Sequence, residues 1–349
     1  MRSLEPIGHA DVLAGLWRAA QERRLAHALA FVGAEGVGKF LAAERFAAGL
    51  LCARGIGAPC GACGPCKRLR IDSHPDVLVV DPTVEGLETI SIGHVTPRPD
   101  GPKQPIAQFL SLRAMENGWR IVLVRECDRL VEEAQNALLK TLEEPGEDTL
   151  IVLETARPDR LLATIHSRCV RVPFGPLARA DVERVLAGQG TPREELARLA
   201  VLSDGAPGRG LALARAGVFE MLAVLERAVG ADPDPCARVA EWQEVEGVFP
   251  GKTPSAQARA KARVFLDLAA GVVRDALRIR AGLAADALPC GVLAGRLQAV
   301  PDVVLGTSLE RILLARQDVE QNLAPDAAVE RALYACEALA HHAADTSRC

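Results

Sequence analysis

A glycine-rich segment at residues 33–40, Gly-Ala-Glu-Gly-Val-Gly-Lys-Phe, constrains the fold more than any other part of this sequence. In the pattern G-x-x-x-x-G-K-S/T, backbone N–H groups cradle nucleotide phosphates, the lysine reaches the β- and γ-phosphates, and the last hydroxyl binds Mg²⁺. The residues that form the predicted cradle are Gly33, Gly36, Gly38 and Lys39. The last position is Phe40, which offers no oxygen to a metal. The segment therefore predicts a cradle that binds nucleotide poorly, or holds it without hydrolysing it.

The residues around this phosphate loop have the alternation expected of an α/β protein. An apolar run at 28–32 predicts a buried strand that leads into the loop, and helical spacing follows from 38 to about 53. Further strands are predicted at 76–81 (buried), 120–125, 149–155 and 169–173, with helices at about 106–115 and 132–144. Strands that alternate with helices predict βαβ units and a parallel sheet.

The second half of the chain has a different pattern. Residues 177–216 carry only short helical patterns, and long helices rich in Ala, Leu and Arg follow, broken by a loop around 250–254. We therefore expect three parts, an α/β domain at 1–174, a small helical domain at 175–216 and an all-α domain at 217–349.

Composition excludes several classes of protein. The net charge of −4 over 349 residues argues against a broad basic surface for nucleic acid. The N-terminus has no signal-peptide core, and no run of 18 apolar residues occurs in the sequence. We expect a cytoplasmic protein without a membrane partner, in which cysteines serve as metal ligands or buried thiols more often than as disulfides.

Four cysteines lie close together at 52–66, directly after the predicted phosphate-loop helix. They are Cys52, Cys60, Cys63 and Cys66, with Gly and Pro filling the gaps. Four thiolates complete a closed tetrahedral zinc site with no open position for catalysis, so the spacing predicts a structural Zn²⁺ module. His74 lies farther along and is not needed as a ligand.

The strand at 120–125 should carry the acidic motif that partners a phosphate loop. In a working ATPase an Asp supports Mg²⁺ and the following Glu polarises the attacking water. Arg125 stands at the Asp position and Glu126 at the Glu position, whereas Asp128 is expected only to favour a helix start. Because Phe40 and Arg125 each remove support for the same ion, the pair predicts a loss of hydrolysis.

Two segments resemble a known family. Residues 136–145, Asn-Ala-Leu-Leu-Lys-Thr-Leu-Glu-Glu-Pro, and 161–169, Leu-Leu-Ala-Thr-Ile-His-Ser-Arg-Cys, are similar to those of the clamp-loader AAA+ ATPases of bacterial DNA replication. The resemblance is specific over about 1–175. It implies an AAA+ domain with an inserted zinc module, followed by a helical lid and a helical collar that serves in oligomerisation.

The resemblance also implies roles for single residues. In this family the Ser-Arg-Cys motif supplies an arginine finger in trans, and Arg168 holds that position here. Thr155 occupies the position of a residue that senses the γ-phosphate. Gly208 replaces the arginine of the second sensor, and the neighbouring Arg209 should point elsewhere, since one helical step turns a side chain by about 100°.

Together these features imply a subunit without intrinsic ATPase activity that holds structural zinc and binds ATP or ADP weakly or not at all. Its implied partners are the motor subunits, the clamp-opening subunit, the sliding clamp and primed DNA. Two alternatives stay open, the ATP-hydrolysing motor subunit of the same loader, which Lys39 and Glu126 favour, and a DNA-binding zinc protein on an inert scaffold.

Overall fold

The computed structural model describes residues 6–99, 101–102, 104–116, 118–230 and 233–346. The chain divides into two compact units, Met1–Asp181 and Val182–Cys349, and each is described separately below.

The first unit is built on a sheet of five parallel strands. They are β1 (Ala28–Gly33), β2 (Val77–Val80), β3 (Arg120–Val124), β4 (Thr149–Thr155) and β5 (Val170–Phe174). Their order across the sheet is β2-β3-β4-β1-β5, and every pair of neighbours runs parallel. This confirms the predicted parallel α/β architecture. The carboxyl ends of β1, β3 and β4 meet at one edge, where Val32 pairs with Thr155 in register.

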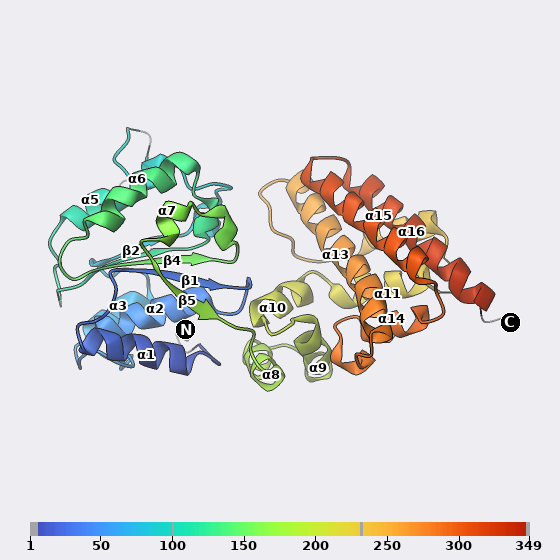
Figure 1. Ribbon diagram of the computed structural model, residues 1–349, viewed down its shortest axis with the longest axis horizontal. Helices are drawn as coiled ribbons and strands as arrows, with labels where there is room; N and C mark the ends of the chain where they lie inside the picture. The colour runs from blue at the N-terminus through green and yellow to red at the C-terminus, as the bar shows by residue number, and fades with distance from the viewer. Residues whose placement is uncertain (1–5, 100, 103, 117, 231–232, 347–349) are drawn as a thin grey trace. The chain divides into compact units, whose positions relative to one another are not determined.

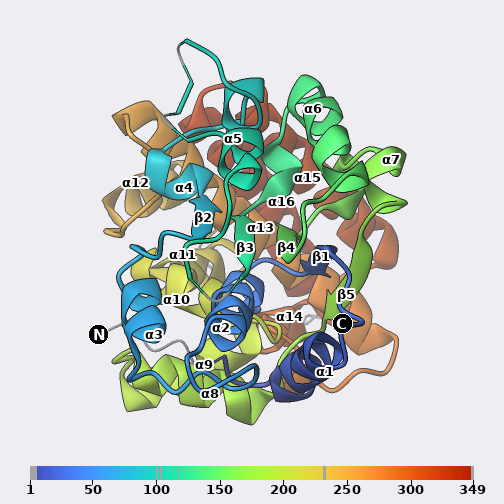
Figure 2. The ribbon, with the colours of Figure 1, turned by 90° about the vertical axis from the view of Figure 1, so that its left-hand side faces the viewer.

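Helices cover both faces of this sheet (Figures 1 and 2). On one face lie α1 (Ala10–Gln21), α2 (Lys39–Leu50) and α3 (Gly64–Arg70), and on the other lie α5 (Ile106–Ser111) and α6 (Glu132–Glu143). The amphipathic α6 turns Ala134, Leu138 and Leu142 into a core shared with Val122 and Ile151 of the central strands. The central strands are buried on both faces, as expected for a parallel sheet with helices on each side.

Three predicted elements differ from the observed ones. Helix α2 ends at Leu50 and not near residue 53, which leaves Cys52 free to enter the cysteine module. Helix α5 ends at Ser111 because Leu112 adopts an extended conformation with ψ 151°, so the prediction to about 115 was too long. Strand β2 is an edge strand and only Val80 is fully buried in it, whereas a buried strand was expected.

The second unit is helical, and no strand occurs in its described residues, 182–230 and 233–346. Helix α8 (Arg179–Gly188) crosses the boundary between the two units. The shorter helices of the second unit are α9 (Arg193–Leu202), α10 (Pro207–Arg215), α11 (Val218–Ala228), α12 (Pro235–Glu244) and α14 (Gly291–Ala294). The long ones, α13 (Pro254–Arg280), α15 (Asp302–Glu320) and α16 (Pro325–Thr346), pack side by side (Figure 1). Thr253 ends the predicted loop by capping α13, since its hydroxyl accepts a hydrogen bond from the N–H of Ala256 at 3.2 Å.

No helix in the described part of the chain combines the length and the apolar character needed to span a bilayer.

Candidate functional site

The phosphate loop connects β1 to α2, which is the strand–loop–helix order that the motif requires. Gly36 and Gly38 have φ values of 81° and 98°, in the left-handed region that glycine tolerates best. Gly33 closes against β5, where an added Cβ would lie 2.2 Å from the carbonyl oxygen of Phe174. The glycines are therefore required by the backbone of the loop itself.

Lys39 does not extend into open space at the start of α2. Its Nζ donates to the carbonyl oxygen of Ala34 at 2.8 Å and lies 2.9 Å from Oε1 of Glu154. The Lys39 side chain is 2% exposed and that of Glu154 is 9% exposed, so the ion pair is buried. The contact with Glu154 was not predicted from the sequence, although a carboxylate within the apolar run of β4 could have indicated it.

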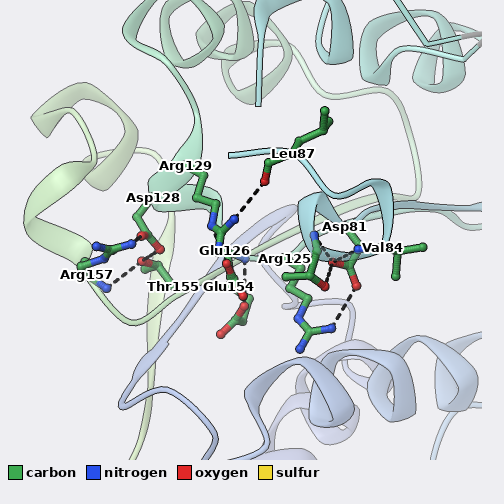
Figure 3. Close-up of polar contacts among 11 residues, drawn as sticks. Asp81, Val84, Leu87, Arg125, Glu126, Asp128, Arg129, Glu154, Thr155 and Arg157 are labelled. Atoms are coloured by element: carbon green, nitrogen blue, oxygen red, sulfur yellow. Dashed lines mark hydrogen bonds and ion pairs between the residues drawn. The ribbon is translucent and has the colours of Figure 1, made fainter. Parts of the chain in front are cut away.

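The two positions that lack a magnesium ligand lie next to each other. The guanidinium carbon of Arg125 is 5.3 Å from the centroid of the buried Phe40 ring, close enough for a cation–π contact. Arg125 also forms an ion pair with Asp81 at 3.0 Å (Figure 3). Burial raises the pKa of Asp81, but hydrogen bonds from Thr83 and Arg125 outweigh burial, so its pKa is lowered. A basic and an aromatic side chain thus stand in contact at the two positions where the motif has its metal-supporting groups.

Glu126, at the predicted catalytic position, is held in an unusual backbone conformation with φ 48°. Its carboxylate pairs with Arg129 at 2.6 Å, and its N–H donates to Oε2 of Glu154 at 3.0 Å. Burial raises the pKa of Glu126. The carboxylate of Glu126, which would polarise the attacking water in a working ATPase, is therefore already paired with Arg129.

Thr155 is fully buried at the end of β4, and its hydroxyl donates to Oδ1 of Asp128 at 2.7 Å. The other oxygen of Asp128 accepts from Nε of Arg157 at 2.9 Å (Figure 3). The expectation that Asp128 merely favours a helix start was too narrow, because its side chain is 3% exposed and joins two segments. The hydroxyl of Thr155, the predicted γ-phosphate sensor, is therefore already hydrogen-bonded to a residue of its own chain.

The four cysteines of the predicted zinc module come together as the sequence indicates. The Sγ atoms of Cys52, Cys60, Cys63 and Cys66 all lie within 4.8 Å of one another, and none forms a disulfide. In a tetrahedral site with Zn–S bonds of about 2.3 Å the sulfurs are about 3.8 Å apart, so the group fits Zn²⁺.

Hydrogen bonds and burial set the acidity of these thiols. Backbone N–H groups of Ala62 and Cys63 lower the pKa of Cys60 to about 6, which favours a thiolate, whereas burial raises that of Cys66 to about 12. His74 is outside the group: its Nδ1 accepts from the N–H of Asp76, and its Nε2 lies 3.6 Å from Glu116.

Arg168 follows α7 (Ala163–His166) and lies in the connection to β5. Its guanidinium donates to the carbonyl oxygen of Thr164 at 2.9 Å and pairs with Glu143 at the end of α6. The side chain remains 32% exposed. A partly exposed arginine held by local contacts can be presented to another molecule with little loss of conformational freedom.

Comparison with known proteins adds to this geometry. The family model described as "DNA polymerase III, delta subunit" matches residues 8–178. The chain is 34% identical over 189 residues to DNA polymerase III subunit delta' of Bacillus subtilis, covering 54% of this chain and 53% of that protein. It is 36% identical over 222 residues to subunit delta' of Pseudomonas aeruginosa, covering 60% of this chain and 64% of that protein. Residues 8–178 belong to the DNA polymerase III delta-prime family.

The family-model match at residues 8–178 includes the phosphate loop, the cysteine module and Arg168. The chain spans between about half and two thirds of the length of these delta-prime relatives. A solved DNA polymerase III gamma-subunit-related protein from Thermotoga maritima covers 94% of the chain at 20% identity with a TM-score of 0.50, so the likeness extends to the fold of most of the chain.

The second-sensor segment lies beyond residues 8–178, which the family model matches. Gly208 and Arg209 lie in the first turn of α10 (Pro207–Arg215), and both are exposed. Their role remains a prediction, as do the boundaries expected at 174 and 216.

Proposed function

We propose that this protein is a non-hydrolysing subunit of a DNA polymerase III clamp loader. In this proposal it supplies Arg168 as an arginine finger to ATP bound by a neighbouring subunit and so assists in loading the sliding clamp on primed DNA. Delta-prime relatives and the family match support the loader assignment.

One observation carries the non-hydrolysing part of the proposal. Phe40 and Arg125 stand at the two positions that support Mg²⁺ in the motif, and they contact each other. Phosphoryl transfer in phosphate-loop enzymes depends on the metal to neutralise charge between the β- and γ-phosphates. A site with phenylalanine and arginine at these two positions has no ligand for the ion at either of them.

The proposed finger rests on the position of Arg168 and on its geometry. A planar guanidinium can form two parallel hydrogen bonds to phosphate oxygens, which suits it to charge that develops on a transferred phosphoryl group. Glu143 holds the guanidinium of Arg168 at the surface through an ion pair in which both side chains are partly exposed. Such a pair contributes little free energy, so Arg168 can exchange Glu143 for a phosphate at small cost.

The remaining parts of the proposal concern partners and cofactors. We infer a structural Zn²⁺ held by the four cysteines, which would fix the segment at 52–66 without taking part in catalysis. The partners are the motor subunits and the clamp-opening subunit, and the location is the cytoplasm. Residues 175–216 would serve as the lid and 217–349 as the collar that joins the assembly.

Reconstitution tests this function directly. The isolated protein should show negligible ATPase activity with Mg²⁺, and a loader assembled with Arg168→Ala should assemble normally but hydrolyse ATP more slowly in the presence of clamp and primed DNA. Robust turnover by the isolated chain would instead favour the motor-subunit alternative. Unchanged turnover by the Arg168→Ala loader would remove the finger role.

A further inference from the structure

Glu154 places a buried carboxylate against the lysine that should bind phosphate. The Nζ of Lys39 lies 2.9 Å from Oε1 of Glu154 and 2.8 Å from the carbonyl oxygen of Ala34. A carboxylate and a carbonyl oxygen are the kinds of acceptor that a β- or γ-phosphate oxygen would replace. The side chain of Lys39 is thus bonded to acceptors of its own chain.

The carboxylate is fixed at both of its oxygens. Oε2 of Glu154 accepts a hydrogen bond from the N–H of Glu126 at 3.0 Å. Glu126 adopts φ 48°, a conformation that is uncommon for a non-glycine residue and that orients its N–H toward Glu154. Glu154 also lies on β4, which stands between β3 and β1 in the sheet, and its backbone pairs with Phe31 of β1.

The charges around the cradle oppose an incoming anion. Glu35 in the loop and Glu154 both interact electrostatically with the half-buried Glu126. The nearby guanidinium groups are engaged by carboxylates, Arg125 by Asp81 at 3.0 Å and Arg129 by Glu126 at 2.6 Å. A nucleotide would bring further negative charge into a region that already holds buried carboxylates, which is costly at low dielectric.

We propose that Glu154 is an internal ligand for Lys39 that takes the place of a nucleotide phosphate and keeps the loop nucleotide-free. The inference deepens the proposed function at the same site, since it gives a cause for weak nucleotide binding beyond the missing magnesium ligands. Nucleotide entry would require Lys39 to leave Glu154, and the carboxylate would then face the phosphates without its partner. Glu154 is a positioning residue here, acting through Lys39.

Isothermal titration calorimetry of the full chain with ADP, with and without Mg²⁺, tests the proposal. Glu154→Gln removes the charge and keeps a side-chain oxygen for the Glu126 N–H, so it should tighten ADP binding by about tenfold or more. Adding Lys39→Ala to Glu154→Gln should cancel the gain. The matched control is Glu147→Gln, which removes an exposed carboxylate at the opposite edge of the sheet, before β4, and should leave ADP binding unchanged.

Two results would overturn the proposal, equal ADP affinity in the wild type and Glu154→Gln, or a gain that persists when Lys39 is replaced by Ala. If the Gln variant does not fold, a double-mutant cycle of Lys39→Met and Glu154→Met decides the question, read as urea unfolding and ADP binding. The paired variant should be more stable than either single variant, and additive losses would argue against the pair. Because these measurements use the isolated chain, the proposal can fail while the Arg168 finger survives, and the reverse also holds.

Discussion

Arg125 and Asp81 are joined by an ion pair of 3.0 Å between residues 44 positions apart in the sequence. The ion pair uses Oδ2 of Asp81, while Oδ1 caps the short helix α4 (Pro82–Glu85) by accepting from the N–H groups of Thr83 and Val84. The arginine that replaces a magnesium-supporting Asp is therefore part of the structure that anchors β2 to β3. Arg125 cannot bind the metal, but it forms an ion pair that stabilises the fold.

Asp81→Asn should lower the free energy of unfolding by about 1 kcal/mol at pH 7, since it weakens a cap and a partly exposed ion pair together. The folded-state pKa of Asp81 lies below its ordinary value of 3.8. The contribution is therefore present above pH 3.8 and is lost as the pH falls through the lower folded-state pKa. Urea unfolding at several pH values should show the difference between wild type and variant shrinking below that pH. A constant difference down to pH 3 would argue against the ion pair as its source.

Asp128→Ala should cost about 2 kcal/mol of unfolding free energy, because the buried hydroxyl of Thr155 loses its acceptor and Arg157 loses its carboxylate. Asp128→Asn retains an oxygen for Thr155 and should cost less. The control is Asp159→Ala, an exposed position that should change stability by less than about 0.5 kcal/mol. Equal stability of the Asp128→Ala and Asp159→Ala variants in urea titrations would contradict the network.

The cysteine module should hold about one zinc ion per chain, measured by elemental mass spectrometry of the purified protein. Cys63→Ser should lose most of the metal and lower the melting temperature, because ligand binding and local folding are coupled. Cys236→Ser, at an exposed cysteine of the second unit, should keep both the zinc and the melting temperature. Full zinc content in Cys63→Ser would show that the metal is held elsewhere.

Arg168→Lys should behave like Arg168→Ala in a reconstituted loader, because an ammonium keeps the charge but lacks the planar fork. Both variants should change the unfolding free energy by less than about 1 kcal/mol, since the pair with Glu143 is partly exposed. The expected loss of clamp-dependent ATPase activity is on the order of tenfold or more. Full activity of the Lys variant would reduce the role of Arg168 to its charge.

Local sequence patterns determined a large part of this protein. The phosphate loop, the alternation of strands and helices and the cysteine module could be predicted, because each depends on neighbours within a few tens of residues. The loop backbone has positive φ at Gly36 and Gly38, which glycine tolerates best, and the cysteine spacing allows the thiols to meet. Phe40 and Arg125 could be identified as departures because the motif assigns a chemical role to each position.

Only the tertiary structure decided which carboxylates contact Lys39, Thr155 and Arg125. Glu154, Asp128 and Asp81 belong to segments distant in the sequence from Lys39, Thr155 and Arg125 respectively, and the strand order brings each carboxylate to its partner. Neither periodicity nor spacing predicts which charges meet at the carboxyl edge of a parallel sheet. The sequence by itself determined that the metal ligands are absent, and the packing of five strands determined that the carboxylate of Glu154 pairs with the phosphate-loop lysine.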